Sequence, residues 1–145
     1  MKVSECMTRN VKMANPGETL RDAARMMADL DAGVLPVSDG DRLVGMITDR
    51  DIAIRAIAIG KGPDTKIADV MSHEVMYCYD DEDSDAVLRN MGDIQVRRLP
   101  VLNREKRLIG IVSLADLAST GQTARAGEAL SGIVRPGGEH SQSIH

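Results

Sequence analysis

The chain of 145 residues contains one pattern twice, and this repeat limits the folds that it can adopt. Matching residues first stand 64 positions apart: Met7 and Met71, Val11 and Val75, Leu35-Pro36-Val37 and Leu99-Pro100-Val101. After the next turn the spacing is 65, as between Gly45 and Gly110 or Asp51 and Asp116. A turn tolerates one inserted residue. Each repeat of about 55 residues is too small to bury enough apolar surface alone, so the two should pack together as one pseudo-symmetric body.

Both repeats show the same order of predicted elements, β-α-β-β-α, which indicates the α/β (α+β) class. Apolar residues at helical spacing predict the long helix of each repeat. Thr19 and Asp22 are expected to form a capping box on the first of these helices, and Asp83 or Ser84 to cap the second. The predicted strands are 11–13, 34–37, 42–47, 76–78, 98–102 and 107–112, and the predicted helices are 20–30, 49–59, 87–94 and 114–119.

This pattern divides the chain into three segments. Residues 1–60 form the first repeat with the start of a connector, residues 61–120 form the second repeat, and residues 121–145 form a C-terminal tail. Glycines and a proline mark the connector at 59–64. Beyond about Thr120 the periodic pattern fades, and 137–143 has the composition of a disordered segment. The tail is therefore predicted to be flexible.

Composition excludes several classes of function. Tyr77 and Tyr79 are the only aromatic residues, which argues against RNA or single-strand binding, and the net charge of −4 attracts neither nucleic acid nor an anionic membrane. Without an apolar run of roughly 20 residues or a secretion signal, a cytoplasmic location is expected. A Cys6–Cys78 disulfide is not expected there, and neither the cysteines nor the three histidines have metal-ligand spacing. No nucleophile or acid–base pair is evident, so the chain is predicted not to be an enzyme.

Each repeat ends a predicted strand with a glycine, a hydroxyl residue and an acid: Gly45-Met46-Ile47-Thr48-Asp49-Arg50-Asp51 and Gly110-Ile111-Val112-Ser113-Leu114-Ala115-Asp116. One interpretation is a helix capping box formed by the hydroxyl and the acid. The other is a nucleotide site, in which the helix start and the hydroxyl donate to a phosphate and the ionised acid accepts hydrogen bonds from a ribose diol. Both interpretations hold if the acid caps its helix in the empty state and contacts the ligand in the bound state. The glycine allows close approach of a neighbouring backbone or of a ligand.

With these motifs and the Leu-Pro-Val strand upstream of each, residues 3–120 resemble a tandem pair of cystathionine-β-synthase (CBS) domains, also called a Bateman module. The resemblance implies that the repeats pack sheet to sheet and bind adenosine-containing ligands (AMP, ADP, ATP, NAD or S-adenosylmethionine) in the clefts between them. Members of this family are typically regulatory sensors, so the ligand is expected to be regulatory and not a catalytic cofactor. The exposed helices at 49–59 and 114–119 are expected to pair with a second copy in a homodimer.

The resemblance also assigns residues to two ligand sites. The Asp116 site comprises Asn15, Leu20, Ala32, Gly33, Val34, Arg98, Ile111, Ser113 and Asp116. The Asp51 site comprises Met46, Ile47, Thr48, Arg50, Asp51, Tyr79, Val96 and Arg97. The second repeat is similar to the nucleotide-binding repeat of γ-type subunits of AMP-activated kinases, where a basic residue at the place of Arg98 meets phosphate. Because Val34 is its uncharged counterpart and Asp49 adds an acid beside Asp51, the Asp116 site is predicted to prefer phosphorylated adenosine and the Asp51 site a less anionic ligand.

The sequence therefore predicts a stand-alone regulatory or signal-transduction protein that binds an adenosine-containing ligand and acts in trans on an unidentified effector protein. The alternative is an interaction scaffold with vestigial nucleotide sites, in which both boxes only cap helices. Stabilisation by nucleotide separates the two, because only a binder is stabilised. No nucleic-acid or membrane partner is expected.

Overall fold

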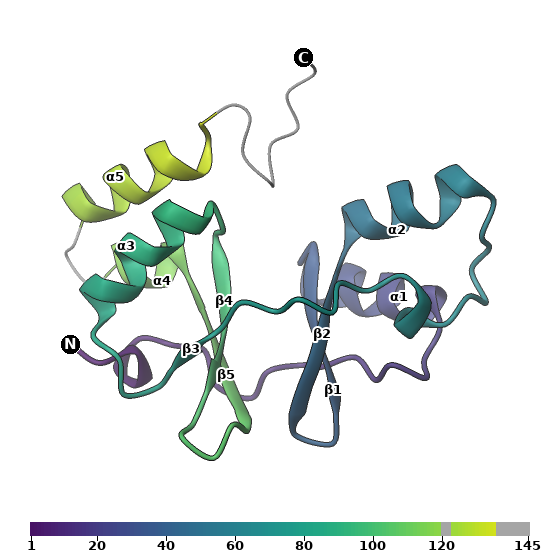
Figure 1. Ribbon diagram of the computed structural model, residues 1–145, viewed down its shortest axis with the longest axis horizontal. Coiled ribbons are helices and arrows are strands. Elements are labelled where there is room, and N and C mark those ends of the chain that lie inside the picture. The colour runs from purple at the N-terminus through teal and green to yellow at the C-terminus, as the bar shows by residue number, and fades with distance from the viewer. Residues whose placement is uncertain (120–122, 136–145) are drawn as a thin grey trace. The chain divides into compact units, whose positions relative to one another are not determined.

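The computed structural model describes residues 1–119 and 123–135, within which no helix is long and apolar enough to span a membrane. The chain forms two compact units. Unit 1 consists of Met1–Val11, Met76–Glu105 and the chain from Ile109 onward, and unit 2 consists of Lys12–Val75 and Lys106–Leu108. The N-terminal residues of the first repeat thus belong to the unit of the second repeat, as their purple trace beside the green elements shows (Figure 1).

Unit 2 is built around a two-stranded antiparallel sheet. Its elements are α1 (Leu20–Leu30), β1 (Val34–Asp39), β2 (Arg42–Thr48), α2 (Asp49–Arg55) and the 3-10 turns η2 (Ile57–Ile59) and η3 (Ile67–Asp69). Leu35 lies opposite Ile47 in the sheet, and Ala14 adds a single parallel bridge to Val37. The apolar face of α1 packs into the same core as these strands, because residues three and four apart share one side of a helix.

Unit 1 contains a three-stranded sheet in the order β3-β4-β5, with β3 parallel to β4. Its elements are η1 (Val3–Glu5), β3 (Cys78–Tyr79), α3 (Ser84–Ile94), β4 (Arg98–Leu102), β5 (Leu108–Ser113, apart from its first residue), α4 (Leu114–Ala118) and α5 (Thr123–Ile133). Its core contains Val3, Val87, Leu88, Met91, Leu99, Val101, Val112 and Leu117. Val3 of the first repeat therefore completes the core of the second.

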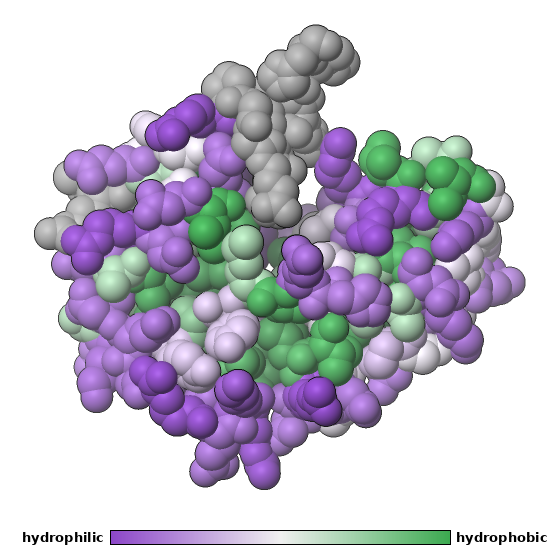
Figure 2. Space-filling model, viewed as in Figure 1, coloured by the Kyte–Doolittle hydropathy of each residue, from purple (hydrophilic) through white to green (hydrophobic). Residues whose placement is uncertain are grey.

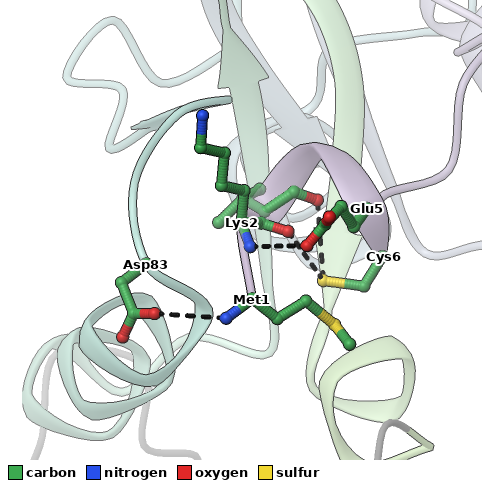
Figure 3. Close-up of polar contacts among 6 residues, drawn as sticks. Met1, Lys2, Glu5, Cys6 and Asp83 are labelled. Atoms are coloured by element: carbon green, nitrogen blue, oxygen red, sulfur yellow. Dashed lines mark hydrogen bonds and ion pairs between the residues drawn. The ribbon is translucent and has the colours of Figure 1, made fainter.

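The N-terminal segment also caps α3 (Figure 3). Asp83 is the N-cap residue, but its side chain makes no capping hydrogen bond. Instead, the backbone N–H of Ser84 donates to the carbonyl of Met1 at 2.8 Å, and the Met1 ammonium lies 3.5 Å from Asp83 Oδ1. The N–H of Val3 donates to the carbonyl of Glu82 at 3.0 Å. A residue 83 positions away in sequence, Met1, thus satisfies a helix-start N–H that a local side chain usually satisfies.

The predicted α/β class is confirmed, as are the α-β-β-α order within each repeat and the capping box of Thr19 and Asp22 on α1. Several predicted elements differ in detail: the strand predicted at 76–78 is Cys78–Tyr79, and the helix predicted at 87–94 begins at Ser84. Residues 11–13 are not a strand, because only Ala14 bridges to the sheet. The helix predicted at 49–59 ends at Arg55 and resumes as η2, because Ala56 adopts φ −124° and ψ −71°, outside α-helical geometry.

The range predicted to be a flexible tail contains α5, which the sequence analysis did not anticipate. The buried residues of α5 include Ala126 and Ala129, and residues this small give no strong apolar stripe in a sequence. Figure 1 shows α5 lying along α3. The remainder of the predicted tail, 120–122 and 136–145, lies outside the described residues.

Candidate functional site

Both predicted boxes form with the same geometry. Thr48 N donates to Asp51 Oδ2 and Asp51 N donates to Thr48 Oγ1, each at 3.0 Å. Ser113 and Asp116 form the same two bonds, also at 3.0 Å. The capping interpretation is therefore confirmed for both motifs. Each acid is held at the end of a strand and the start of a short helix, α2 or α4, by bonds that it can exchange for others.

The two acids differ in what surrounds them. Asp51 Oδ1 lies 3.9 Å from a guanidinium nitrogen of Arg55, one turn later on α2. Asp116 has no ion pair with any residue in 1–119 or 126–135. Burial raises the pKa of the Cys6 thiol, and the negative charges of Asp116 and Glu5 raise it further. Asp51 thus has a cation nearby, whereas the charge of Asp116 acts on the Cys6 thiol.

The glycine that begins each motif admits a neighbouring chain segment. A Cβ atom on Gly110 would lie 2.6 Å from the sulfur of Met7 and 2.9 Å from the carbonyl oxygen of Thr8. A Cβ atom on Gly45 would likewise lie 2.6 Å from the sulfur of Met71. Of the two partners that the sequence left open for these glycines, the structure shows the neighbouring backbone. Met7 and Met71 stand at matching positions of the two repeats, but the sequence alone gave no reason to pair them with Gly110 and Gly45.

Paired backbone hydrogen bonds fix the same segments. Thr8 N donates to Ile111 O at 2.8 Å, and Ile111 N donates to Thr8 O at 3.0 Å. In unit 2, Ser72 N donates to Met46 O at 2.8 Å and Met46 N donates to Ser72 O at 3.0 Å. The predicted site residues Ile111 and Met46 therefore use both backbone groups to hold the strand that leads to each box.

The strand start next to each box differs in charge between the two units. Asp49 N donates to Gly33 O at 2.9 Å, and Leu114 N donates to Arg97 O at 2.8 Å, so these pairs occupy equivalent places in the two units. In unit 2 the Asp49 carboxylate folds over Gly33, where its Oδ2 would lie 2.8 Å from a Cβ atom. In unit 1 the equivalent strand start has two exposed guanidinium groups, Arg97 and Arg98. The strand start thus lies against an anion, Asp49, in unit 2, whereas in unit 1 it carries two exposed cations.

The predicted site residues are divided between the units. Unit 2 contains Asn15, Leu20, Ala32, Gly33, Val34, Met46, Ile47, Thr48, Arg50 and Asp51, and unit 1 contains Tyr79, Val96, Arg97, Arg98, Ile111, Ser113 and Asp116. Leu20 is 2% exposed and Ile47 is 0% exposed in the core of unit 2, so a ligand contact from either would use backbone atoms. Asn15 is exposed, and its Oδ1 accepts a hydrogen bond from Gly17 N in a turn.

Tyr79 is held by an arginine that the sequence analysis did not identify. The guanidinium carbon of Arg104 lies 4.1 Å from the centroid of the Tyr79 ring, within cation–π distance. Arg104 also donates to both oxygens of Asp81, at 2.7 and 2.8 Å, and this bonding holds the pKa of Asp81 below its usual value. Tyr77 meets the Tyr79 ring edge-on, with the centroids 5.6 Å apart. No local pattern reveals this cluster, because Arg104 stands 23 positions after Asp81.

Both cysteines are free thiols in unit 1. Burial raises the pKa of the Cys78 thiol to about 12, with smaller contributions from Glu82 and Cys6. In residues 1–119 and 123–135, no group of three or more His, Cys, Asp and Glu side chains is arranged to hold a metal ion.

Cys78 is expected to resist thiol reagents in the folded protein, because the reactive thiolate is scarce at pH 8 when the pKa is about 12. Labelling of a Cys6→Ser variant, which leaves one cysteine, with a chromogenic disulfide reagent measures this directly. The rate should be at least tenfold lower in buffer than in denaturant. Equal rates in both solutions would show that Cys78 is accessible in the native state.

A family model described as CBS domain matches the chain twice, at residues 3–57 and 67–121. The uncharacterized protein YlbB of Bacillus subtilis (strain 168) is 41% identical over 135 residues, covering 91% of this chain and 90% of YlbB. The crystal structure of Hypoxic Response Protein I with two coordinated zinc ions has a TM-score of 0.74 at 36% identity, covering 83% of this chain and 98% of that one. 

The CBS domain pair of protein MJ0100, in complex with 5′-methylthioadenosine and S-adenosyl-L-methionine, also has a TM-score of 0.74. It is 26% identical and covers 86% of this chain and 98% of its own. Each of the two family matches includes one of the two strand-to-helix motifs described above, with its glycine and its capping box. The chain belongs to the CBS domain family, as a tandem pair of CBS domains.

Proposed function

We propose that this protein is a stand-alone regulator that binds an adenosine-containing ligand and acts in trans on a separate effector protein. The main support is that two boxes of equal geometry hold Asp51 and Asp116 at the start of a short helix after a strand. An ionised carboxylate accepts both hydrogen bonds of a ribose diol. The MJ0100 domain pair, at 26% identity, holds two adenosine-containing ligands. The residues that the family resemblance assigns from the other repeat remain part of each proposed site.

The two sites are proposed to differ in the charge of the ligand that they prefer. Arg98 favours a phosphorylated adenosine such as AMP or ATP at the Asp116 site, because forked guanidinium donors suit phosphate. Asp49 disfavours phosphate at the Asp51 site by charge repulsion. That site therefore suits a less anionic ligand such as S-adenosylmethionine. In both, the ligand is regulatory, and the protein is proposed to work in the cytoplasm without catalysis.

Thermal unfolding in the presence of nucleotide tests this function. AMP, ATP, NAD and S-adenosylmethionine are added separately, and at 100 times the dissociation constant a binder gains about 2.7 kcal/mol of stability. We expect at least one of the four to raise the unfolding temperature of the wild-type protein. A variant with both Asp51→Ala and Asp116→Ala should show no rise, although its lost caps lower its baseline stability.

An interaction scaffold is the second candidate, and the observation that favours it is that both acids cap helices in the structure. A scaffold with vestigial sites would unfold at the same temperature in every nucleotide. That result would leave capping as the only role of the boxes and would remove the sensor function.

We further propose that the protein is a homodimer. Ile54, Ile57 and Ile59 of α2 and η2 are 50%, 59% and 65% exposed. Figure 2 shows hydrophobic residues gathered at the surface of this part of the molecule. Native mass spectrometry of freshly purified protein reports the number of copies and any retained nucleotide together. A monomer in that spectrum would contradict the dimer and leave the ligand proposal standing.

A further inference from the structure

Helix α5 contacts α3 through backbone atoms. Ala129 Cα lies 3.0 Å from the place that a Cβ atom on Gly92 would occupy. A Cβ atom on Gly132 would lie 2.6 Å from the carbonyl oxygen of Gly92. The two helices therefore meet closely only because these positions have no side chain. Ala126 and Ala129 are the buried residues of this contact, at 7% and 4% exposure.

The side chains of α5 that this contact buries, Ala126 and Ala129, are small. Of the larger apolar side chains, Leu130 on α5 and Val134 just beyond its end are 42% and 58% exposed, and Ile133 is partly buried. Since hydrophobic stabilisation scales with the apolar area removed from water, alanines hold the helix less strongly than larger apolar side chains would. One side chain adds polar bonds: Gln95 Nε2 donates to the carbonyls of Gly132 at 2.9 Å and Arg135 at 3.2 Å.

The Ser113–Asp116 box is connected to α5 through α4. The hydroxyl of Ser119, at the end of α4, donates to the carbonyl of Asp116 at 2.7 Å. Leu117, which is 0% exposed, packs into the core cluster that contains Ala126 and Ala129. A five-residue helix such as α4 is marginal by itself and depends on its cap and its packing. A change at Asp116 therefore reaches the residues against which α5 rests.

We infer that α5 is a releasable helix, and that its position on α3 is maintained by the Ser113–Asp116 box. The inference rests on the proposed function, in which Asp116 turns from Ser113 to a ribose. When Asp116 leaves its cap, α4 loses the bonds that fix its start, and the weakly held α5 separates from α3. Nucleotide binding and α5 release then favour each other, because coupling between two equilibria is reciprocal.

Two glycines of α5 give a matched pair of variants. Gly132→Leu places a side chain against Gly92 and should release α5, whereas Gly127→Leu adds its side chain where a Cβ atom meets nothing within 4 Å and should not. Hydrogen exchange with mass spectrometry is expected to show faster exchange across 123–133 in Gly132→Leu alone. By reciprocity, this variant should bind AMP at least about fivefold more tightly than Gly127→Leu, the lower end of typical coupling.

The wild-type protein supplies two further readouts. AMP should accelerate exchange across 123–133, and Asp116→Ala without nucleotide should do the same, whereas Asp51→Ala should not. If AMP stabilises the protein but leaves this exchange unchanged, or if both leucine variants bind AMP equally, the inference is wrong and the proposed function stands. If no adenosine ligand binds the wild-type protein, the proposed function fails and the inference fails with it.

Discussion

Gly110→Ala is expected to destabilise unit 1 by about 2–3 kcal/mol, as overpacked core positions commonly do. The new methyl group would lie 2.6 Å from Met7 sulfur and 2.9 Å from the Thr8 carbonyl. The methionine side chain can rotate away, but the carbonyl is held by its hydrogen bond from Ile111 at 3.0 Å. Urea unfolding curves, with exchange of the 1–11 amides followed in parallel, measure the effect.

Gly127→Ala is the matched control, because a Cβ atom there meets nothing within 4 Å. In a helix this change should be neutral or stabilising by up to about 1 kcal/mol. Adding Met7→Ala to Gly110→Ala should restore only part of the lost stability, since the contact with the carbonyl remains. Equal stabilities of the Gly110 and Gly127 variants would show that the N-terminal segment does not lie against β5 as described.

Asp116→Ala is expected to weaken AMP binding by more than about 100-fold, because a hydrogen bond to a charged group contributes about 1.5–3 kcal/mol and the carboxylate is proposed to make two. Asp51→Ala should weaken it less than about fivefold, because Asp49 already disfavours a phosphate beside that box. Isothermal titration calorimetry with AMP compares the two variants directly. The expected asymmetry rests on Arg98, whose counterpart in the first repeat is the uncharged Val34, and on Asp49 beside Asp51.

Asp22→Ala is the control variant for the loss of a helix cap without the loss of a ligand contact. Asp22 closes the α1 capping box with bonds of 3.0 and 3.2 Å, like those of Asp116, but it is assigned to neither ligand site. This variant should lose about 1 kcal/mol of stability and keep its AMP affinity. Equal losses of affinity in Asp51→Ala and Asp116→Ala would refute the asymmetry. A loss in Asp22→Ala as large as in Asp116→Ala would mean that capping, and not ligand contact, sets the affinity.

The parts of the fold that depend on local pattern were predictable. The repeat spacing located the two boxes, and the hydroxyl and acid three positions apart predicted bonds that the structure confirms at Thr48 and Ser113. Capping is a local property, since its partners are separated by three residues. The difference between Asp49 and Leu114 was also readable, because each stands directly after a hydroxyl residue.

Contacts between segments distant in sequence were not predictable in this way. Nothing in the first 11 residues indicates that Val3 belongs to the core of the second repeat. The α3–α5 contact depends on the absence of side chains at Gly92 and Gly132, and a missing side chain leaves no periodic signal. Arg104 reaches Tyr79 from a turn, so its role appears only when the sheet places the two together.

The segment before each repeat packs with the other repeat, so each half of the chain depends on the other half to fold. A fragment of residues 1–60 would carry the strand partner of Ile111 without Ile111 itself, and would lack Ser72, the partner of its own Met46. A fragment that starts at residue 61 would carry Ile111 without its partner Thr8, and Ser72 without its partner Met46. Neither fragment alone contains all the segments of one unit. In a mixture, each fragment supplies the segment that the other is missing, so the two should reassemble by complementation.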